Sequence, residues 1–325
     1  MLTRSTLFAF VVAAVGWGTG GIATRAALLD GVGEWTMVTI RVVIAALLVG
    51  GLLLVRGVRT IGGKNLQIGT VMGLLNLTFP YVVFTFAYAN ASAGFVGLFA
   101  ALIPLATAIY AHFMLRDEPL TRSKVIGLSV GFAGVMVLLA SGDTGLGDAG
   151  RPMVAAGLSI AGVATIGYAG VYARRHAGEY DATTVTGVQF VVGALLLIPA
   201  MLVIDGIPND VSNLGWSLLL YMGIASTFLP FMIFYVLLRT ISATSVSLIG
   251  YLVPLVALVG GILLLNENLE LGIAVGGLLI FVGMLLTDRA GRLGGRHGHV
   301  VGETPSAAEE ASAASPPLSG GDRSR

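Results

Sequence analysis

Long apolar runs follow one another along the first 287 residues, separated by short turns that carry most of the polar and charged side chains. A helix needs about 20 mostly apolar residues to cross the ~30 Å hydrocarbon core of a bilayer, and it satisfies its own backbone hydrogen bonds there. A membrane β-barrel would instead show alternating apolar and polar residues over strands of about ten residues. The pattern predicts an all-α integral membrane protein with ten transmembrane helices, at about residues 7–28, 35–55, 67–88, 94–115, 123–140, 153–173, 183–204, 214–238, 244–265 and 271–287.

The two halves of the chain are similar in sequence at an offset of 150 residues. At this offset Pro80, Phe84, Ser92, Ala93, Val96, Leu98, Leu102, Pro104 and Leu105 meet identical residues at Pro230, Phe234, Ser242, Ala243, Val246, Leu248, Leu252, Pro254 and Leu255. Because each half holds an odd number of spans, the second copy is expected to lie upside down relative to the first. We predict two inverted five-helix repeats, residues 5–141 and 152–288, and a disordered tail rich in Gly, Ala, Ser and Pro over residues 289–325.

Lysine and arginine residues gather at every second turn. They are Arg4, Arg56, Arg59, Lys64, Arg116, Arg122, Lys124, Arg174, Arg175, Arg239, Arg289, Arg292 and Arg296, whereas the turns on the other side hold Arg151, with Arg25 near the end of the first span. The positive-inside rule therefore predicts that both termini are cytoplasmic. Since the net charge is only +1 and the basic residues are spread over these turns, nucleic-acid binding has no support.

Composition narrows the chemistry further. Hydrophobic residues make up 56% of the chain and charged residues 11%, a balance that belongs in a bilayer rather than in water. Cysteine is absent, which excludes disulfides, thiolate catalysis and cysteine-bound metals. The histidines, at positions 112, 176, 297 and 299, do not gather with other catalytic or ligand groups. Neither an intramembrane enzyme nor a metal or cofactor site is predicted.

A set of short motifs occurs in order, and its last part occurs twice. The first half holds Trp17-Gly18, Arg41, Ala91-Ser92-Ala93, Leu102-Ile103-Pro104-Leu105 and Glu118-Pro119-Leu120. The second half repeats the later motifs as Ser242-Ala243, Leu252-Val253-Pro254-Leu255 and Asn266-Glu267-Asn268-Leu269. The chain resembles the drug/metabolite transporter superfamily, specifically its EamA-type members, which have ten helices in two five-helix repeats.

This resemblance implies a multi-pass carrier in the plasma membrane that moves small metabolites, amino acids or drugs, often outward, by alternating access and without a cofactor. Its partners would be a small-molecule substrate and the lipid bilayer, and the oligomeric state stays open. The alternative is a channel-like or structural membrane subunit without carrier activity, for which a ring of polar residues or a long extramembrane partner domain would be expected.

Arg41 is the charged residue placed deepest in a predicted span, about seven residues from its outer end, or ~10 Å at 1.5 Å per residue. Arginine in mid-helix costs about 2.5–3.5 kcal/mol on insertion scales, so its side chain is expected to face a polar cavity or a partner. Two hypotheses remain open. Arg41 binds a carboxylate or phosphate of the substrate, or it snorkels to the headgroups or pairs with Glu34.

Other polar or amphipathic side chains stand inside apolar runs and are candidates for a midplane substrate site. They are Trp17, Thr19, Asn76, Tyr81, Tyr168 and Gln189, together with Tyr172 and Tyr221. Gln189 and Phe190 occupy the region that corresponds to Arg41 in the second half. Each of these residues also fits a plainer role, since hydroxyls and amides join helices and Tyr and Trp anchor at headgroups.

Prolines, glycines and glutamates that recur in the two halves indicate bends and contacts. Pro80, Pro104, Pro230 and Pro254 each remove a helix hydrogen bond, so gating kinks and static bends are both predicted there. Glycines four residues apart, as at Gly127 and Gly131, are expected to allow close helix packing. Glu118 and Glu267 are expected to pair with Arg122 or to cap the helix that follows each of them. No acidic residue lies in mid-span, which leaves three alternatives: coupling through His112, coupling through the charge of the substrate itself, and uncoupled facilitated transport.

Overall fold

The structure is a computed structural model that describes residues 4–58, 61–115, 120–176, 178–233 and 249–295. Within these ranges the chain is helical and contains no strand. Seven helical stretches are long and apolar enough to cross a membrane, namely Glu34–Val55, Gly63–Asn90, Ala93–Met114, Arg122–Ser141, Pro152–Arg175, Ala182–Ile204 and Asn213–Ile233, and two shorter apolar helices cover Leu252–Leu265 and Leu271–Thr287. The prediction of an all-α membrane protein is confirmed.

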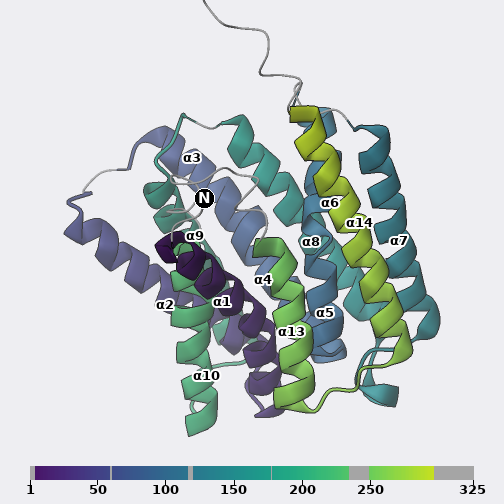
Figure 1. Cartoon of the computed structure of the whole chain (residues 1–325). Coiled ribbons are helices and arrows are strands. Elements are labelled where there is room, and N and C mark those ends of the chain that lie inside the picture. The colour runs from purple at the N-terminus through teal and green to yellow at the C-terminus, as the bar shows by residue number, and fades with distance from the viewer. Residues whose placement is uncertain (1–3, 59–60, 116–119, 177, 234–248, 296–325) are drawn as a thin grey trace, which may run out of the picture.

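The first repeat contains α1 (Arg4–Leu29), α2 (Glu34–Val55), α3 (Gly63–Met72), the π-helix η1 (Gly73–Thr78), α4 (Phe79–Asn90), α5 (Ala93–Ala100), α6 (Ile103–Met114) and α7 (Arg122–Ser141). The second contains α8 (Pro152–Arg175), α9 (Ala182–Ile204), α10 (Asn213–Gly223), the π-helix η3 (Ile224–Phe228), α13 (Ile249–Leu265) and α14 (Leu271–Gly295), after the short 3-10 turn η2 (Gly147–Ala149) (Figure 1). With 26 residues, α1 is about 39 Å long and also reaches across a bilayer, although it carries Arg25 and a glycine-rich middle. Residues 234–248, which hold the end of the predicted span 214–238 and the start of the predicted span 244–265, lie outside the described ranges.

Helices α7 and α14 show that the second repeat is inverted. A Cβ atom placed on Gly127 would lie 2.6 Å from the carbonyl oxygen of Gly283, and one on Gly134 would lie 2.6 Å from that of Gly276. Rising numbers on α7 therefore meet falling numbers on α14, so these equivalent helices run antiparallel. The glycines predicted to allow close packing let the two backbones touch within one chain.

The other helix contacts follow the same two-fold relation. Helices α2 and α9 are also equivalent and antiparallel, with Thr39 donating to Leu197 O at 3.2 Å and Val49 opposite Gly187. Helix α1 packs on α13, and its equivalent α8 packs on α6. Two inverted repeats therefore wrap around each other rather than standing side by side.

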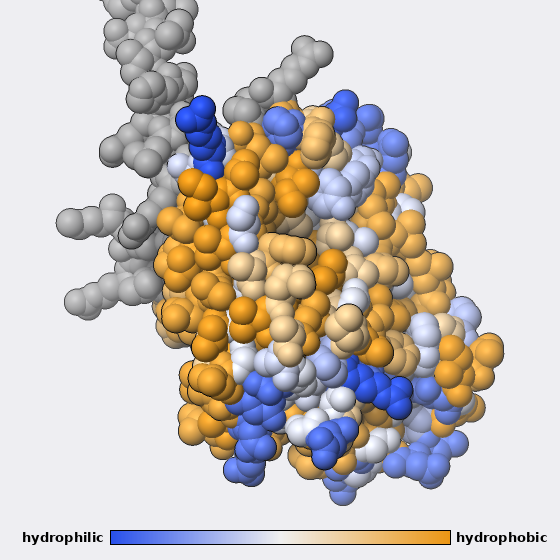
Figure 2. All heavy atoms as spheres, turned by 90° about the vertical axis from the view of Figure 1, so that its right-hand side faces the viewer, coloured by the Kyte–Doolittle hydropathy of each residue, from blue (hydrophilic) through white to orange (hydrophobic). Residues whose placement is uncertain are grey.

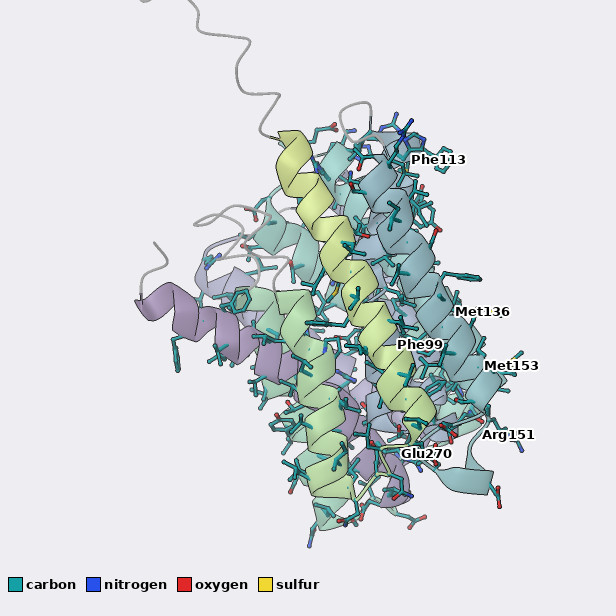
Figure 3. All side chains as sticks on the ribbon, turned by 45° about the vertical axis from the view of Figure 1, so that its right-hand side comes forward. Phe99, Phe113, Met136, Arg151, Met153 and Glu270 are labelled. Atoms are coloured by element: carbon teal, nitrogen blue, oxygen red, sulfur yellow. The ribbon has the colours of Figure 1, made fainter. Side chains whose placement is uncertain are left out.

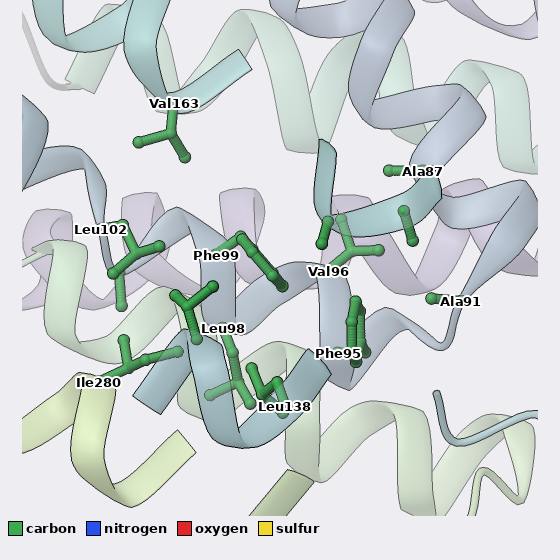
Figure 4. Close-up of a cluster of buried hydrophobic side chains, with 14 of the residues drawn as sticks. Ala87, Ala91, Phe95, Val96, Leu98, Phe99, Leu102, Leu138, Val163 and Ile280 are labelled. Carbon is green, nitrogen blue, oxygen red and sulfur yellow. The ribbon is translucent and has the colours of Figure 1, made fainter. Parts of the chain in front are cut away.

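The surface and the core differ as expected for a membrane protein. A wide apolar belt separates two polar ends (Figure 2), and Phe113, Met136 and Met153 point away from the bundle (Figure 3). Among the described residues, the largest buried cluster combines α5, α7 and α14 with parts of α4 and α8, and Phe95, Phe99, Leu138 and Ile280 are among its members (Figure 4). Close packing of side chains is what joins helices inside lipid, since lipid is as apolar as the side chains themselves.

Candidate functional site

Arg41 lies on α2 and its side chain is buried, with 8% of its surface exposed. The guanidinium reaches across to the second repeat. Its Nε and Nη2 donate to Thr227 Oγ1 at 3.2 and 3.0 Å, and Nη2 also donates to Ser226 Oγ at 3.3 Å. A longer bond of 3.4 Å joins Nη1 to Thr24 Oγ1 of α1. Three hydroxyl groups thus hold the charge at the contact between the repeats.

The partners of Arg41 are neutral. Its guanidinium carbon lies 4.5 Å from the centroid of the Tyr81 ring, a cation–π contact between α2 and α4. In the part of the chain that the structure describes, no carboxylate is within ion-pair distance of Arg41, and the expected pair with Glu34 is not formed. A fixed positive charge is therefore held in the membrane interior by hydroxyls and one aromatic face.

Ser226 and Thr227 lie in a π-helical turn, which explains how both hydroxyls reach Arg41. Pro230 has no N–H and would clash with the carbonyl four residues earlier in a regular α-helix. The chain widens instead, and Leu229 N bonds to Ile224 O, five residues back. Glycines of α1 make room for this turn, because a Cβ on Gly20 would lie 2.7 Å from Ser226 Oγ.

The first repeat contains an equivalent π-helical turn before Pro80. There Phe79 N bonds to Leu74 O, again five residues back, and the π-helix η1 carries Asn76 and Thr78. Asn76 Nδ2 donates to Gln189 Oε1 of α9 at 3.5 Å. Arg41 and Gln189 are both the eighth residue of equivalent helices, and each contacts the π-helix of the other repeat. Gln189 therefore occupies the pseudo-symmetric position of Arg41.

Two other predicted residues line the same region. Thr19 Oγ1 and Tyr221 OH share a hydrogen bond of 2.6 Å, which joins α1 to α10. Trp17 makes an edge-to-face contact with Phe231, with ring centroids 5.7 Å apart, and Phe231 in turn contacts Phe190 of α9 at 5.3 Å. Trp17 and Thr19 therefore join the two repeats close to Pro230.

Tyr168 belongs to a different group. Its ring lies 5.6 Å from Tyr110 of α6 and 6.4 Å from Tyr172, which contacts His176 at 4.4 Å. These four aromatic side chains run along α8 toward its C-terminal end. In the described residues no contact joins Tyr168 to the Arg41 group.

The remaining prolines differ in their surroundings. The chain leaves the α-helix between Ala100 and Ile103, and Pro104 stands in the first turn of α6. Pro254 lies within α13, which continues through it. Regular helix is thus interrupted near Pro80, Pro104 and Pro230 but not at Pro254.

The expectation that Glu267 caps the following helix is wrong. Its carboxylate accepts from Ala93 N at 2.7 Å and Gly94 N at 3.3 Å, at the start of α5 in the other repeat. Burial raises the pKa of Glu267, while these two bonds and the Arg25 charge act against that rise. Asp205 does the same at α2, where it accepts from Thr36 N at 2.7 Å. Glu267 and Asp205 therefore each cap the start of a helix that belongs to the other repeat. Glu118 lies outside the described residues.

Sequence reasoning missed the hydroxyls that hold Arg41. Ser226 and Thr227 stand just before Pro230 in the sequence. Their closeness to this proline was the one feature of the sequence that could have marked them as site residues. Hydroxyls in membrane helices usually bond to their own backbone, as Thr24 does to Gly20 O at 2.8 Å. Ser226 and Thr227 instead contact Arg41 of α2, and the π-helical turn that allows this contact is visible only in the structure.

Other features of the structure do not suggest chemistry. A surface groove of about 360 Å³ between α1 and α13 is lined by apolar residues and Thr19, and Arg41 is not among them. Within the described ranges, no three His, Asp or Glu side chains gather as metal ligands would. The Arg41 group holds a charge and hydrogen-bonding groups, which suits binding rather than bond breaking.

Comparison with known proteins decides the family. The model of the EamA-like transporter family matches residues 4–140 and 153–287, once in each repeat. The chain belongs to the EamA-like transporter family. It is therefore a multi-pass membrane transporter and not an enzyme.

Several relatives of this EamA transporter are similar over most of their length. Protein PecM of Dickeya dadantii is 28% identical over 241 residues, covering 71% of this chain and 79% of PecM. An uncharacterized transporter of Archaeoglobus fulgidus is 25% identical over 235 residues, covering 70% and 79%. A crystal structure with 20% identity matches with a TM-score of 0.63 over 88% of this EamA transporter and 99% of that chain, which supports the fold.

Proposed function

We propose that this transporter exports a small organic solute that carries a carboxylate or phosphate group, and that the group binds at Arg41. The observation that carries the proposal is the buried guanidinium, whose partners are Ser226, Thr227, Thr24 and the ring of Tyr81. A charge is costly in the membrane interior, and neutral hydroxyls offset that cost less than an anion does. An anionic solute can therefore replace the hydroxyls with a net gain.

The proposed mechanism is alternating access by rocking of the two repeats. Arg41 belongs to the first repeat and Ser226 and Thr227 to the second, so an anion that takes over the guanidinium also loosens a contact between the repeats. The two π-helical turns lie at the points where this contact and its counterpart are made. Irregular backbone at the midplane is typical of transporter sites. Trp17, Thr19 and Tyr81 would line the solute path, with Pro80 and Pro230 as bends beside it.

We also place the transporter in the plasma membrane with both termini in the cytoplasm. One end of the bundle carries Arg56, Arg122 and Arg174, and the opposite end carries Asp205 and Glu267. The positive-inside rule assigns the first end to the cytoplasm. Export is inferred from the resemblance to EamA-type carriers, many of which export their substrates.

Flux in proteoliposomes tests the proposal. Purified protein is reconstituted and offered labelled glutamate, lactate, glycerol 3-phosphate and tetraphenylphosphonium, with and without a proton gradient. We expect saturable flux of at least one anionic solute, and Arg41→Gln should reduce it roughly 10- to 100-fold, since hydrogen bonds to charged groups contribute about 1.5–3 kcal/mol. Arg41→Lys keeps the charge but loses the planar fork, so its flux should be intermediate.

Arg56→Gln is the matched control, because Arg56 is an exposed arginine at the opposite, C-terminal end of α2 and bonds only to Thr183 among the described residues. It should leave solute flux unchanged. If folded Arg41→Gln protein carries anions as fast as the wild type, Arg41 has a structural role. If folded wild-type protein carries no compound at all, the alternative of a structural membrane subunit is favoured.

A further inference from the structure

The contact between α9 and η1 contains two buried polar groups that bond to nothing in the described protein. Gln189 is fully buried, and its Oε1 accepts from Asn76, yet no acceptor faces its Nε2. The hydroxyl of Thr78 is also buried without a partner. A Cβ atom on Gly193, one turn after Gln189, would lie 3.3 Å from Thr78 Oγ1, so both groups belong to this one contact.

The π-helix explains why Thr78 lacks the usual partner of a helical threonine. Thr19, Thr70, Thr107 and Thr186 each donate to the carbonyl four residues back. For Thr78 that carbonyl is Leu74 O, which the wide turn pairs with Phe79 N, five residues on, so Thr78 lacks the α-helical geometry that the other four threonines have. The hydroxyl of Thr78 is thereby left for a group outside its own helix.

Leaving such groups unpaired is costly, because each buried donor has lost its hydrogen bonds to water without gaining a replacement. A native protein keeps an unsatisfied buried group where function requires it or where another molecule completes its bonds. Because Gln189 Nε2 is a donor and the Thr78 hydroxyl can donate, the missing partner is a hydrogen-bond acceptor. An apolar side chain of similar shape would avoid the cost at either position.

The position of these groups relates them to Arg41. The antiparallel contacts Thr39–Leu197 and Val49–Gly187 place Gln189 at the level of Leu47. That is six residues inward from Arg41, or about 9 Å along α2 at 1.5 Å per residue. A small organic solute together with two long side chains can bridge this separation.

We propose that Gln189 and Thr78 form a second polar subsite, which accepts a neutral carbonyl or hydroxyl oxygen of the solute whose anionic group binds at Arg41. This inference rests on the proposed function. Because α9 and η1 belong to different repeats, rocking of the repeats opens and closes the subsite, as it does the Arg41 contact. The preferred solutes are therefore anions or zwitterions with one additional uncharged oxygen.

Pairs of labelled solutes that differ in that oxygen test the subsite. Lactate is compared with propionate, and glutamine with norvaline, in proteoliposomes that contain the wild type, Thr78→Val or Gln189→Leu. The wild type should favour the oxygen-bearing member of a pair by roughly 3- to 10-fold, the range for one neutral hydrogen bond. Both variants should reduce that preference to near one while Arg41-dependent flux of the carboxylate persists.

Thr186→Val is the matched control, since Thr186 is a buried threonine of α9 whose hydroxyl bonds to its own backbone. It should keep the preference of the wild type. A second readout needs no solute. Thr78→Val removes a hydroxyl that has no partner, so the purified variant should melt at the same or a higher temperature than the wild type, whereas a structural hydroxyl would lower the melting temperature.

The outcomes separate the two proposals. Anion flux that depends on Arg41 together with an unchanged preference in Gln189→Leu and Thr78→Val overturns the subsite alone. A lower melting temperature of Thr78→Val also overturns it. Absence of anion flux in the folded wild type overturns the proposed function and the subsite with it.

Discussion

The contact between α7 and α14 predicts a large effect for the smallest possible substitution. A Cβ atom on Gly283 would lie 2.4 Å from Gly131 N and 2.6 Å from Gly127 O. Because both neighbours are backbone atoms, no side chain can turn away, and the helices must separate by about 1 Å to restore ordinary contact. Overpacking of this kind costs about 1–3 kcal/mol, and such a gap forfeits a quarter to a half of each dispersion contact along the seam.

Gly157→Ala is the matched control for Gly283→Ala. Gly157 lies within α8, and a Cβ atom there meets nothing within 4 Å. Both substitutions replace a glycine inside a helix and gain about 1 kcal/mol of helix propensity, so the overpacking cost alone should separate the two variants, by roughly 1–3 kcal/mol in the free energy of unfolding. Melting temperatures in one detergent would measure this difference. Gly283→Ala protein that melts at or above Gly157→Ala would refute the backbone contact between α7 and α14.

Three further predictions concern topology, pH and the cation–π contact. The chain has no cysteine, so Ala149→Cys should react with an impermeant maleimide in intact cells, whereas Ser123→Cys should react only after permeabilisation; the reverse pattern would invert the topology. Burial raises the pKa of Glu267 above its ordinary 4.5, so the folded state holds that proton more tightly than the unfolded chain does. The melting temperature of the wild type relative to Glu267→Gln should therefore fall as the pH rises above about 4.5, and a constant difference would contradict it. Tyr81→Phe keeps the aromatic face beneath Arg41 and should retain anion flux, whereas Tyr81→Leu should lower anion affinity by about 0.5–2 kcal/mol, measured as KM; equal values for both variants would assign Tyr81 to packing alone.

The membrane spans and the inverted repeats could be predicted from the sequence, because hydropathy and duplication constrain the chain as a whole. Apolar length determines which segments can span a bilayer, and an odd number of spans per repeat determines the inversion. Gly127 and Gly131 were expected to allow close packing, and the structure shows that they do so within one chain, against Gly283 of α14. These inferences need the positions of small and apolar residues but not the direction of any single side chain.

The site was predicted less completely, because it depends on the direction of side chains. Arg41 and Tyr81 were named as candidates, and the structure brings them together. Tyr168 was grouped with them by composition, but it contacts Tyr110 and Tyr172 instead. Glu267 was assigned to the next helix in the sequence, yet it caps α5, 174 residues away along the chain. A partner across the inverted repeats cannot be found from neighbours in the sequence.

The duplication also shows why Arg41 has a glutamine as its counterpart. Inversion creates two equivalent positions, one in each half of the membrane, and each faces a π-helical turn of the other repeat. Two arginines at these levels, about 9 Å apart, would repel by roughly 2 kcal/mol at an effective dielectric constant of 20, and the second would add its own insertion cost of about 2.5–3.5 kcal/mol. Gln189 keeps hydrogen-bonding capacity at the second position without that charge. In the proposed mechanism this difference orients the solute, because an anionic group gains more at Arg41 in the outer half and an uncharged oxygen gains more at Gln189 in the inner half.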